Sequence, residues 1–253
     1  MHRFYLSPER VTEGDLTLDE RESHHAAIVL RVREGERVAV LDGAGNEFMC
    51  TAATVDKRST RLTVQQKNRI EPLPYRITLL QAITKGKSMD FIIQKATELC
   101  VHRVVTLAAG RSVAQVAQVE DGAAKVGKWR SIAIDSIKQC GSPWLPVIEP
   151  PVTPREFLAR GEVFNLPLIA SLQGRTRHPR EYISEYESEH GSKPDSIGIW
   201  IGPEGDFTPE EGNEILSAGA HPITLGRAIL RSETAALYCL SVLNYDMQAP
   251  RAG

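Results

Sequence analysis

Long apolar runs, clustered cysteines and a large net charge are all missing from this sequence of 253 residues. No apolar stretch approaches the roughly 18 residues that cross a bilayer as a helix, so nothing indicates a membrane protein. The first residues lack the apolar core of a signal peptide, so a cytoplasmic protein is expected. A hydrophobic share of 42% and a charged share of 25% exclude a largely disordered chain.

Cysteine is scarce and scattered, which excludes a disulfide scaffold and argues against a zinc site. The four residues do not form a CxxC pair, and we expect isolated, mostly buried thiols at Cys50, Cys100, Cys140 and Cys239. His24 and His25 are adjacent, which places them on different sides of a helix. We therefore expect no metal site.

Three familiar catalytic signatures are also missing. Lys85-Gly86-Lys87-Ser88 resembles the end of a phosphate-binding loop, but Gln81 stands where the first glycine is required. Gly43-Ala44-Gly45 is followed by Phe48 rather than glycine and lies between two expected strands, so it is no dinucleotide fingerprint. No GxSxG occurs, so a serine hydrolase has no support.

Charge is distributed unevenly although the formal total is only −2. Residues 1–72 carry a net charge of −1, residues 73–149 carry +4 and residues 150–253 carry −5. The chain is therefore no globally basic nucleic-acid binder, and any RNA binding has to use local patches and shape.

The first seventy residues favour β-structure. A short helix at 23–30, with Ser23 as a plausible N-cap, precedes expected strands at 37–41, 47–55 and 61–64. Short strands joined by turns such as Asp42-Gly43 are typical of a small barrel. The prolines of Glu71-Pro72-Leu73-Pro74 indicate a boundary, which divides the chain into domains at 1–72 and 73–253.

Beyond the boundary, strands alternate with helices. Met89, Ile92, Ile93 and Ala96 recur on one helical face, and Thr153 and Thr208 each begin a capping box with proline in the first turn. Strands are expected at 76–81, 103–107, 167–171, 197–201 and 223–225, and helices at 89–99, at 126–140, after Thr153, within 180–196, after Thr208 and from Ser232 to Met247. This alternation predicts an α/β domain with a mainly parallel sheet.

Ligands of such sheets bind beyond the carboxyl ends of the strands, and two of these ends are distinctive. In Ile201-Gly202-Pro203-Glu204-Gly205, a buried strand runs into a turn whose two glycines allow positive φ and close approach of a ligand. A tight turn without any ligand explains these residues about equally well.

The second distinctive end is the stretch from Leu225 to Ala236. Gly226 ends the strand, and Arg231 precedes an expected helix start, which attracts anions. Taken alone, a purely structural interpretation is favoured: Ser232 caps the helix, Glu233 complements the dipole and Arg231 is a surface charge.

Together with residues elsewhere, these two blocks resemble the 16S ribosomal RNA (uracil-N3) methyltransferases of the SPOUT superfamily. The resemblance covers nearly the whole chain in order. It is carried by Arg3-Phe4-Tyr5, His24 to Arg31, Gly35, Asp42-Gly43, Lys87, Gln94 to Leu99, Arg111-Ser112, Lys128-Trp129, Gln139-Cys140, Ile201 to Gly205, Leu225-Gly226 and Ile229 to Ala235. Three positions depart from the usual pattern, with Gly110 in place of an acidic residue, Ser142 in place of arginine and Asp206 in place of glycine.

The resemblance implies an N-terminal PUA-like β-barrel and a C-terminal α/β-knot domain with a deep trefoil knot. It also implies S-adenosylmethionine as cofactor, a homodimer, and 16S ribosomal RNA of the small ribosomal subunit as partner. The cofactor pocket is carried over onto three loops, whose residues are Ser171, Leu172, Ile201, Gly202, Pro203, Glu204, Gly205, Leu225, Gly226, Ile229 and Leu230.

Methylation of uracil N3 requires an unpaired base and loss of the imide proton. Arg231 is the candidate for stabilising charge on the uracil oxygens, and Glu204 and Glu233 are the candidate proton acceptors, although a carboxylate is a weak base at neutral pH. Candidate RNA contacts are Arg3, His24, Arg31, Arg33, Lys87 and Arg111. Two alternatives stay open, namely a SPOUT enzyme with another RNA target and a noncatalytic RNA-binding protein that retains the fold.

Overall fold

A computed structural model describes residues 1–12, 14–112, 122–172 and 174–248 and divides the chain into two compact units. The first unit contains residues 1–72 together with 133–145, and the second contains residues 73–132 and those from 146 onward. The division at Pro72 coincides with the expected boundary, but segment 133–145 was not expected in the first unit. It belongs there because Ile134 and Ile137 pack against Tyr5 and Leu41.

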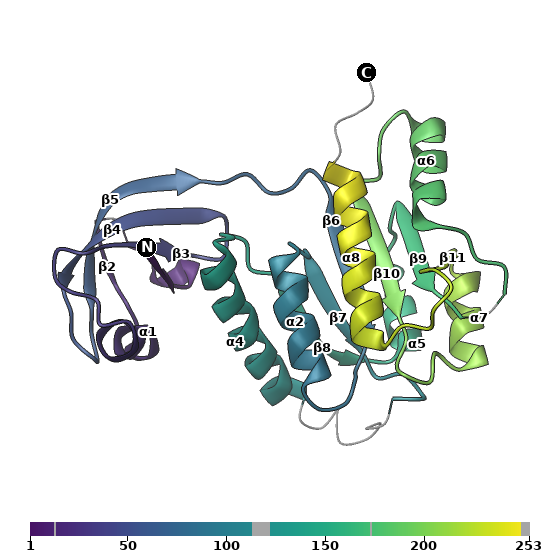
Figure 1. The fold of residues 1–253 in the computed structure, drawn as a ribbon, viewed down its shortest axis with the longest axis horizontal. Coiled ribbons are helices and arrows are strands. Elements are labelled where there is room, and N and C mark those ends of the chain that lie inside the picture. Colours follow the sequence, from purple (N-terminus) through teal and green to yellow (C-terminus); the bar gives the residue numbers. More distant parts are fainter. Residues whose placement is uncertain (13, 113–121, 173, 249–253) are drawn as a thin grey trace. The chain divides into compact units, whose positions relative to one another are not determined.

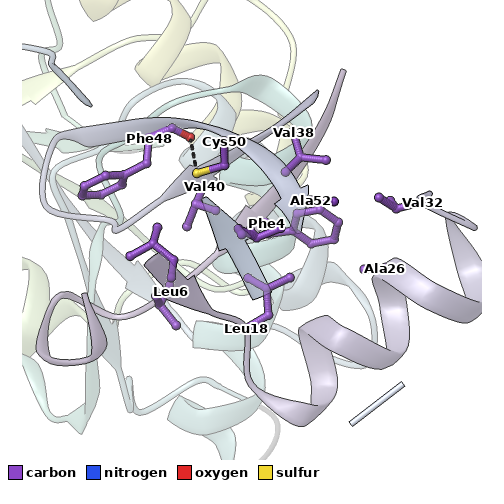
Figure 2. Close-up of a cluster of buried hydrophobic side chains, with 12 residues drawn as sticks. Phe4, Leu6, Leu18, Ala26, Val32, Val38, Val40, Phe48, Cys50 and Ala52 are labelled. Carbon is purple, nitrogen blue, oxygen red and sulfur yellow. Dashed lines mark hydrogen bonds between the residues drawn. The ribbon is translucent and has the colours of Figure 1, made fainter. Parts of the chain in front are cut away.

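The first unit is built around a five-stranded sheet of order β1-β3-β4-β5-β2. Its strands are β1 (His2–Tyr5), β2 (Asp15–Thr17), β3 (Arg37–Leu41), β4 (Asn46–Thr54) and β5 (Arg61–Arg69), with a 3-10 turn η1 (Pro8–Arg10). β1 pairs with β3 in parallel, and the other pairs are antiparallel. Phe4, Leu18, Val40 and Cys50 gather in one apolar cluster on this sheet (Figure 2).

The helix expected at 23–30 begins three residues earlier, so the prediction of Ser23 as N-cap is wrong. Helix α1 (Glu20–His24) is capped by Asp19, whose carboxylate accepts a hydrogen bond from the Glu22 amide. Ser23 is fully buried, and its hydroxyl donates a hydrogen bond to the Leu18 carbonyl and accepts one from the Thr60 amide. The chain then continues as a π-turn, η2 (His25–Val29).

The second unit contains a six-stranded, fully parallel sheet of order β11-β9-β10-β6-β7-β8. Its strands are β6 (Arg76–Ala82), β7 (Arg103–Leu107), β8 (Val147–Val152), β9 (Leu166–Ala170), β10 (Ser196–Ile201) and β11 (His221–Ile223). Its helices are α2 (Ser88–Glu98), the first part of α4 (Gly122–Cys140), α5 (Pro154–Leu158), α6 (Pro179–His190), α7 (Pro209–Ser217) and α8 (Ser232–Gln248). The expected capping boxes of Thr153 and Thr208 are confirmed.

Helices cover both faces of this sheet, which explains its continuous apolar strands. Side chains alternate along each strand, so Leu80 and Trp200 face a core that includes Phe157 of α5 and Ile215 of α7. On the opposite face, α8 packs on β6 and β10 beside α2 (Figure 1). The prediction of a parallel α/β sheet is confirmed.

The sequence analysis missed one edge strand of this sheet and shifted the other, and both strands contain proline. β8 contains Pro150 and Pro151 and was not predicted, because proline interrupts hydrogen-bonding ladders. β11 contains Pro222 and occupies His221–Ile223 instead of the expected 223–225. Both strands are at sheet edges, where a missing amide donor is tolerated. Thr224 and Leu225 consequently fall in a loop.

The cysteines divide evenly rather than being mostly buried. Cys50 and Cys239 are buried, and burial raises the pKa of each thiol to about 12. Cys100 and Cys140 are exposed. Within the described ranges, the chain has no helix of the length and apolarity that a bilayer crossing requires.

Candidate active site

Three loops at the carboxyl edge of the parallel sheet enclose a pocket of about 260 Å³. The loops follow the neighbouring strands β9, β10 and β11, and the first turn of α8 completes the wall. The lining residues are Ala170, Ser171, Leu172, Gly174, Thr176, Ile201, Gly202, Pro203, Glu204, Asp206, Ile223, Thr224, Leu225, Gly226, Arg227, Ala228, Ile229, Leu230, Ser232 and Ala235.

All but one of the eleven expected cofactor residues line this pocket. The exception is Gly205, whose place in the wall is taken by Asp206. The carbonyl of Gly205 instead accepts a hydrogen bond of 2.9 Å from Nη1 of Arg111. Neither Gly202 nor Gly205 adopts the positive φ that was expected of this turn, whereas Asp206 does, with φ of 60°.

Gly202 and Gly226 require glycine for different reasons. A Cβ atom on Gly202 would lie 3.0 Å from Oδ1 of Asp206 and 3.2 Å from the Phe207 nitrogen, so a side chain would crowd the turn and force these atoms to shift. Gly226 has no atom within 4 Å of such a Cβ, but its φ of 109° is strained for any other residue. One glycine closes the turn after β10, and the other shapes the loop before α8.

Ser232 is the first residue of α8 rather than its expected cap, and its hydroxyl connects β6 to the turn after β10. Its hydroxyl donates to the Gly202 carbonyl at 2.7 Å and accepts from Nε2 of Gln81 at 2.9 Å. Gln81 is fully buried on β6 and was missed as a site residue. The available signal was an amide side chain directly after the apolar pair Leu79-Leu80 of this strand.

The candidate catalytic side chains do not form one cluster. Glu204 lines the pocket and is exposed, while Arg231 and Glu233 lie at the start of α8 outside the lining. The Ala235 amide donates to the Arg231 carbonyl at 2.8 Å, so Arg231 directly precedes the helix. Across the described residues, the structure records no ion pair or side-chain hydrogen bond for these three side chains.

The candidate RNA contacts are split between the two units. Arg3, His24, Arg31 and Arg33 belong to the first unit, and Arg3 and His24 line a separate cavity there. Lys87 and Arg111 belong to the second. Lys87 is exposed just before α2.

Arg111 has a structural partner. Its guanidinium donates to the carbonyls of Gly205 and Phe207, so it orients the turn that follows β10.

Each of the three departures from the family pattern has a local explanation. Asp206 tolerates the left-handed conformation, and its carboxylate accepts a hydrogen bond from the Phe207 amide. Gly110 is crowded, because a Cβ atom would lie 3.0 Å from the Thr208 methyl group. The Ser142 hydroxyl hydrogen-bonds to the backbone of Trp144.

No group of three or more histidine, cysteine or acidic side chains able to hold a metal ion occurs in the part of the chain that the structure describes.

Two family models match the chain, each over one of its two regions. The model described as an RNA methyltransferase domain matches residues 71–244. The model described as an RNA methyltransferase PUA domain matches residues 18–65.

Relatives and solved structures agree with these models. The chain is 28% identical to a protein named ribosomal RNA small subunit methyltransferase E from Bacillus subtilis, covering 99% of both. It is 30% identical to the structure of a protein of the same name from Neisseria gonorrhoeae bound to S-adenosyl methionine, with a TM-score of 0.83 and 97% of both chains covered. A methyltransferase from Legionella pneumophila in complex with SAM is also 30% identical, with a TM-score of 0.86 and coverage of 96% and 97%.

The conformation of Gly226 predicts how alanine affects the pocket. We expect Gly226→Ala to weaken S-adenosylmethionine binding about tenfold, because the loop escapes the strain by leaving the conformation that lines the pocket. Gly212→Ala is the control, since Gly212 has an ordinary φ and open space around it. Calorimetric titration measures both, and equal affinities for the two variants would contradict the assignment.

The bridge through Ser232 predicts a loss of stability. Ser232→Ala removes one hydrogen bond from the buried Gln81 amide and one from the Gly202 carbonyl. We expect this loss to lower the unfolding free energy by about 1–3 kcal/mol. Ser241→Ala changes an exposed serine of the same helix and is expected to be nearly neutral. Denaturant unfolding compares the two, and indistinguishable midpoints would show that the bridge is dispensable.

Proposed function

Since this chain belongs to the RNA methyltransferase family, we propose that it transfers the methyl group of S-adenosylmethionine to N3 of a uridine in 16S ribosomal RNA of the small ribosomal subunit. The observation that carries this proposal is the pocket built from the two distinctive sequence blocks. The names of the relatives supply the class of RNA, and two similar structures contain the cofactor.

The residues that line the pocket suit this cofactor. Leu172 is 61% exposed and Ile229 is 79% exposed, so both leave apolar surface that a bound ring would cover. The Glu204 carboxylate provides negative charge for a sulfonium. The cofactor supplies an activated methyl group when bound, and the loops hold it in line with the acceptor. Such alignment contributes up to about 7–11 kcal/mol.

The acceptor requires more help than the donor. Uracil N3 carries a proton and lies on the Watson–Crick edge, so the base has to be unpaired before it reacts. The Arg231 guanidinium and the amides at the start of α8 stabilise negative charge on the uracil oxygens. We favour this stabilisation over a dedicated base, with Glu204 and Glu233 as the carboxylates nearest to that role.

RNA binding completes the proposal. Arg3, His24, Arg31 and Arg33 are proposed to contact RNA from the first unit. Lys87 and Arg111 are proposed to contact it from the second, with Arg111 also orienting the turn after β10. Contacts to phosphate position the RNA without specifying its sequence.

Further parts of the proposal concern architecture and location. We propose that the first unit closes as a PUA-like barrel, that the second contains the trefoil knot of SPOUT enzymes, and that the protein is a cytoplasmic homodimer. The exposed side chains of Tyr238 and Tyr245 support the dimer, because they share one face of α8 and are 42% and 82% exposed.

The function is tested by deleting the gene and analysing nucleosides of small-subunit ribosomal RNA by mass spectrometry. We expect 3-methyluridine to disappear and to return when the gene is restored. If it persists while the purified protein binds S-adenosylmethionine in calorimetry, the enzyme has another target. If the protein binds no S-adenosylmethionine, it is a noncatalytic RNA-binding protein.

The role of Arg231 predicts a defect in rate rather than in binding. We expect Arg231→Ala to lower the single-turnover rate about a hundred- to a thousandfold, because the contact is strongest in the transition state. Arg231→Lys should restore only part, since an ammonium does not reproduce the planar guanidinium. Arg180→Ala removes an exposed arginine of the same unit and serves as the control.

The competing role for Arg231 is a phosphate anchor. That role predicts weaker RNA binding with a shallower salt dependence and a nearly normal rate at saturating RNA. Measurement of both quantities on one variant distinguishes the two roles.

A further inference from the structure

A second cavity is lined only by residues of the first unit and shares none of them with the methyl-transfer pocket. It has a volume of about 730 Å³ and is lined by β1, α1, the π-turn η2 and residues 135–139 of α4. Arg3 and His24, already considered as RNA contacts, are part of its wall. The other groups in the wall determine which class of ligand the cavity can bind.

The carboxylates in the wall are occupied by internal partners. Nζ of Lys138 lies 2.7 Å from one oxygen of Glu22 and 2.9 Å from Asp135. The other oxygen of Glu22 accepts the Tyr5 amide at 3.1 Å, and Arg21 binds Asp135 at 3.0 Å. Because Lys138 and Glu22 are 8% and 4% exposed, this network is a fixed part of the wall.

Arg3 also lines the cavity but takes no part in this network of ion pairs. Its Nε atom is buried and has no hydrogen-bond partner among the described residues. Gly141, with φ of 82°, allows the guanidinium to lie against the backbone, since a Cβ atom there would be 2.9 Å from Cζ of Arg3. Arg3 lines the cavity and forms no ion pair with a carboxylate of the described residues, so its charge is available to a phosphate.

The rest of the wall is suited to a base. Val29 is 60% exposed in the π-turn, and Leu30, His24 and His25 adjoin it. Single π-turns occur often at functional sites. Exposed apolar surface and imidazole rings beside a cation match the chemistry by which proteins hold unstacked bases of single-stranded RNA.

We propose that this cavity binds one unpaired nucleotide of RNA, with its phosphate at Arg3 and its base against Val29 and the histidines. The inference rests on the proposed function, because methylation of N3 requires an unpaired region whose neighbouring nucleotides are also free to be held. The cavity then anchors the RNA at a point separate from the reacting uridine.

The test measures binding of fluorescent hexauridylate to the full-length protein by anisotropy. Arg3→Gln removes the phosphate partner, and Val29→Glu places a negative charge on a wall position that is 60% exposed. We expect each variant to lose about tenfold or more in affinity, with unchanged S-adenosylmethionine binding and thermal midpoint. Arg58→Gln, at an exposed arginine of the same unit outside the cavity, should bind hexauridylate normally.

Competition identifies the ligand class. Uridine monophosphate should displace the hexamer far better than uridine or inorganic phosphate, and equal displacement by inorganic phosphate would reduce the cavity to an anion site and overturn the proposal. Absence of hexauridylate binding by the wild-type protein, or normal binding by both cavity variants, would also overturn it. These outcomes leave the proposed function standing as long as the wild-type protein methylates ribosomal RNA.

Discussion

The Ser232 hydroxyl occupies the point at which three parts of the second unit meet. It accepts a hydrogen bond from the buried Gln81 amide on β6 and donates to the Gly202 carbonyl after β10, while its own backbone begins α8. The pocket exists because the turn after β10 and the loop before α8 are held at fixed positions. A hydroxyl is well suited to this, since it donates and accepts at once, and burial makes each bond costly to lose.

Around that junction, the backbone rather than catalytic side chains shapes the site. A side chain on Gly202 would crowd the Asp206 carboxylate and the Phe207 amide, and Gly226 takes a φ that other residues avoid. Arg111 adds a further restraint by donating to two carbonyls of the same turn. For methyl transfer from an activated donor, which depends mainly on alignment, fixed loops are the appropriate contribution of the protein.

The first unit depends on a different restraint. The buried Lys138–Glu22 ion pair connects the last turns of α4 to α1, and Ile134 and Ile137 pack those turns against Tyr5 and Leu41 of the sheet. Removing one member of a buried pair leaves an uncompensated charge, so the loss of either Lys138 or Glu22 alone is expected to be destabilising. The same ion pair forms part of the wall of the cavity that contains Arg3.

Local patterns determined much of this protein. The resemblance to the methyltransferase family, rather than any local pattern, supplied the pocket loops, and all of their named residues except Gly205 line the pocket. Helical periodicity, the capping boxes of Thr153 and Thr208, and alternation of strands with helices predict the parallel sheet. These succeed because they depend on neighbours in the chain. Tertiary structure alone decided the rest: edge strands that tolerate Pro151 and Pro222, the partners of Ser232, and the attachment of 133–145 to the first unit. Each of these features depends on contacts between groups that are many residues apart in the chain. Tertiary packing determines such contacts, and they produce no periodic pattern in the sequence.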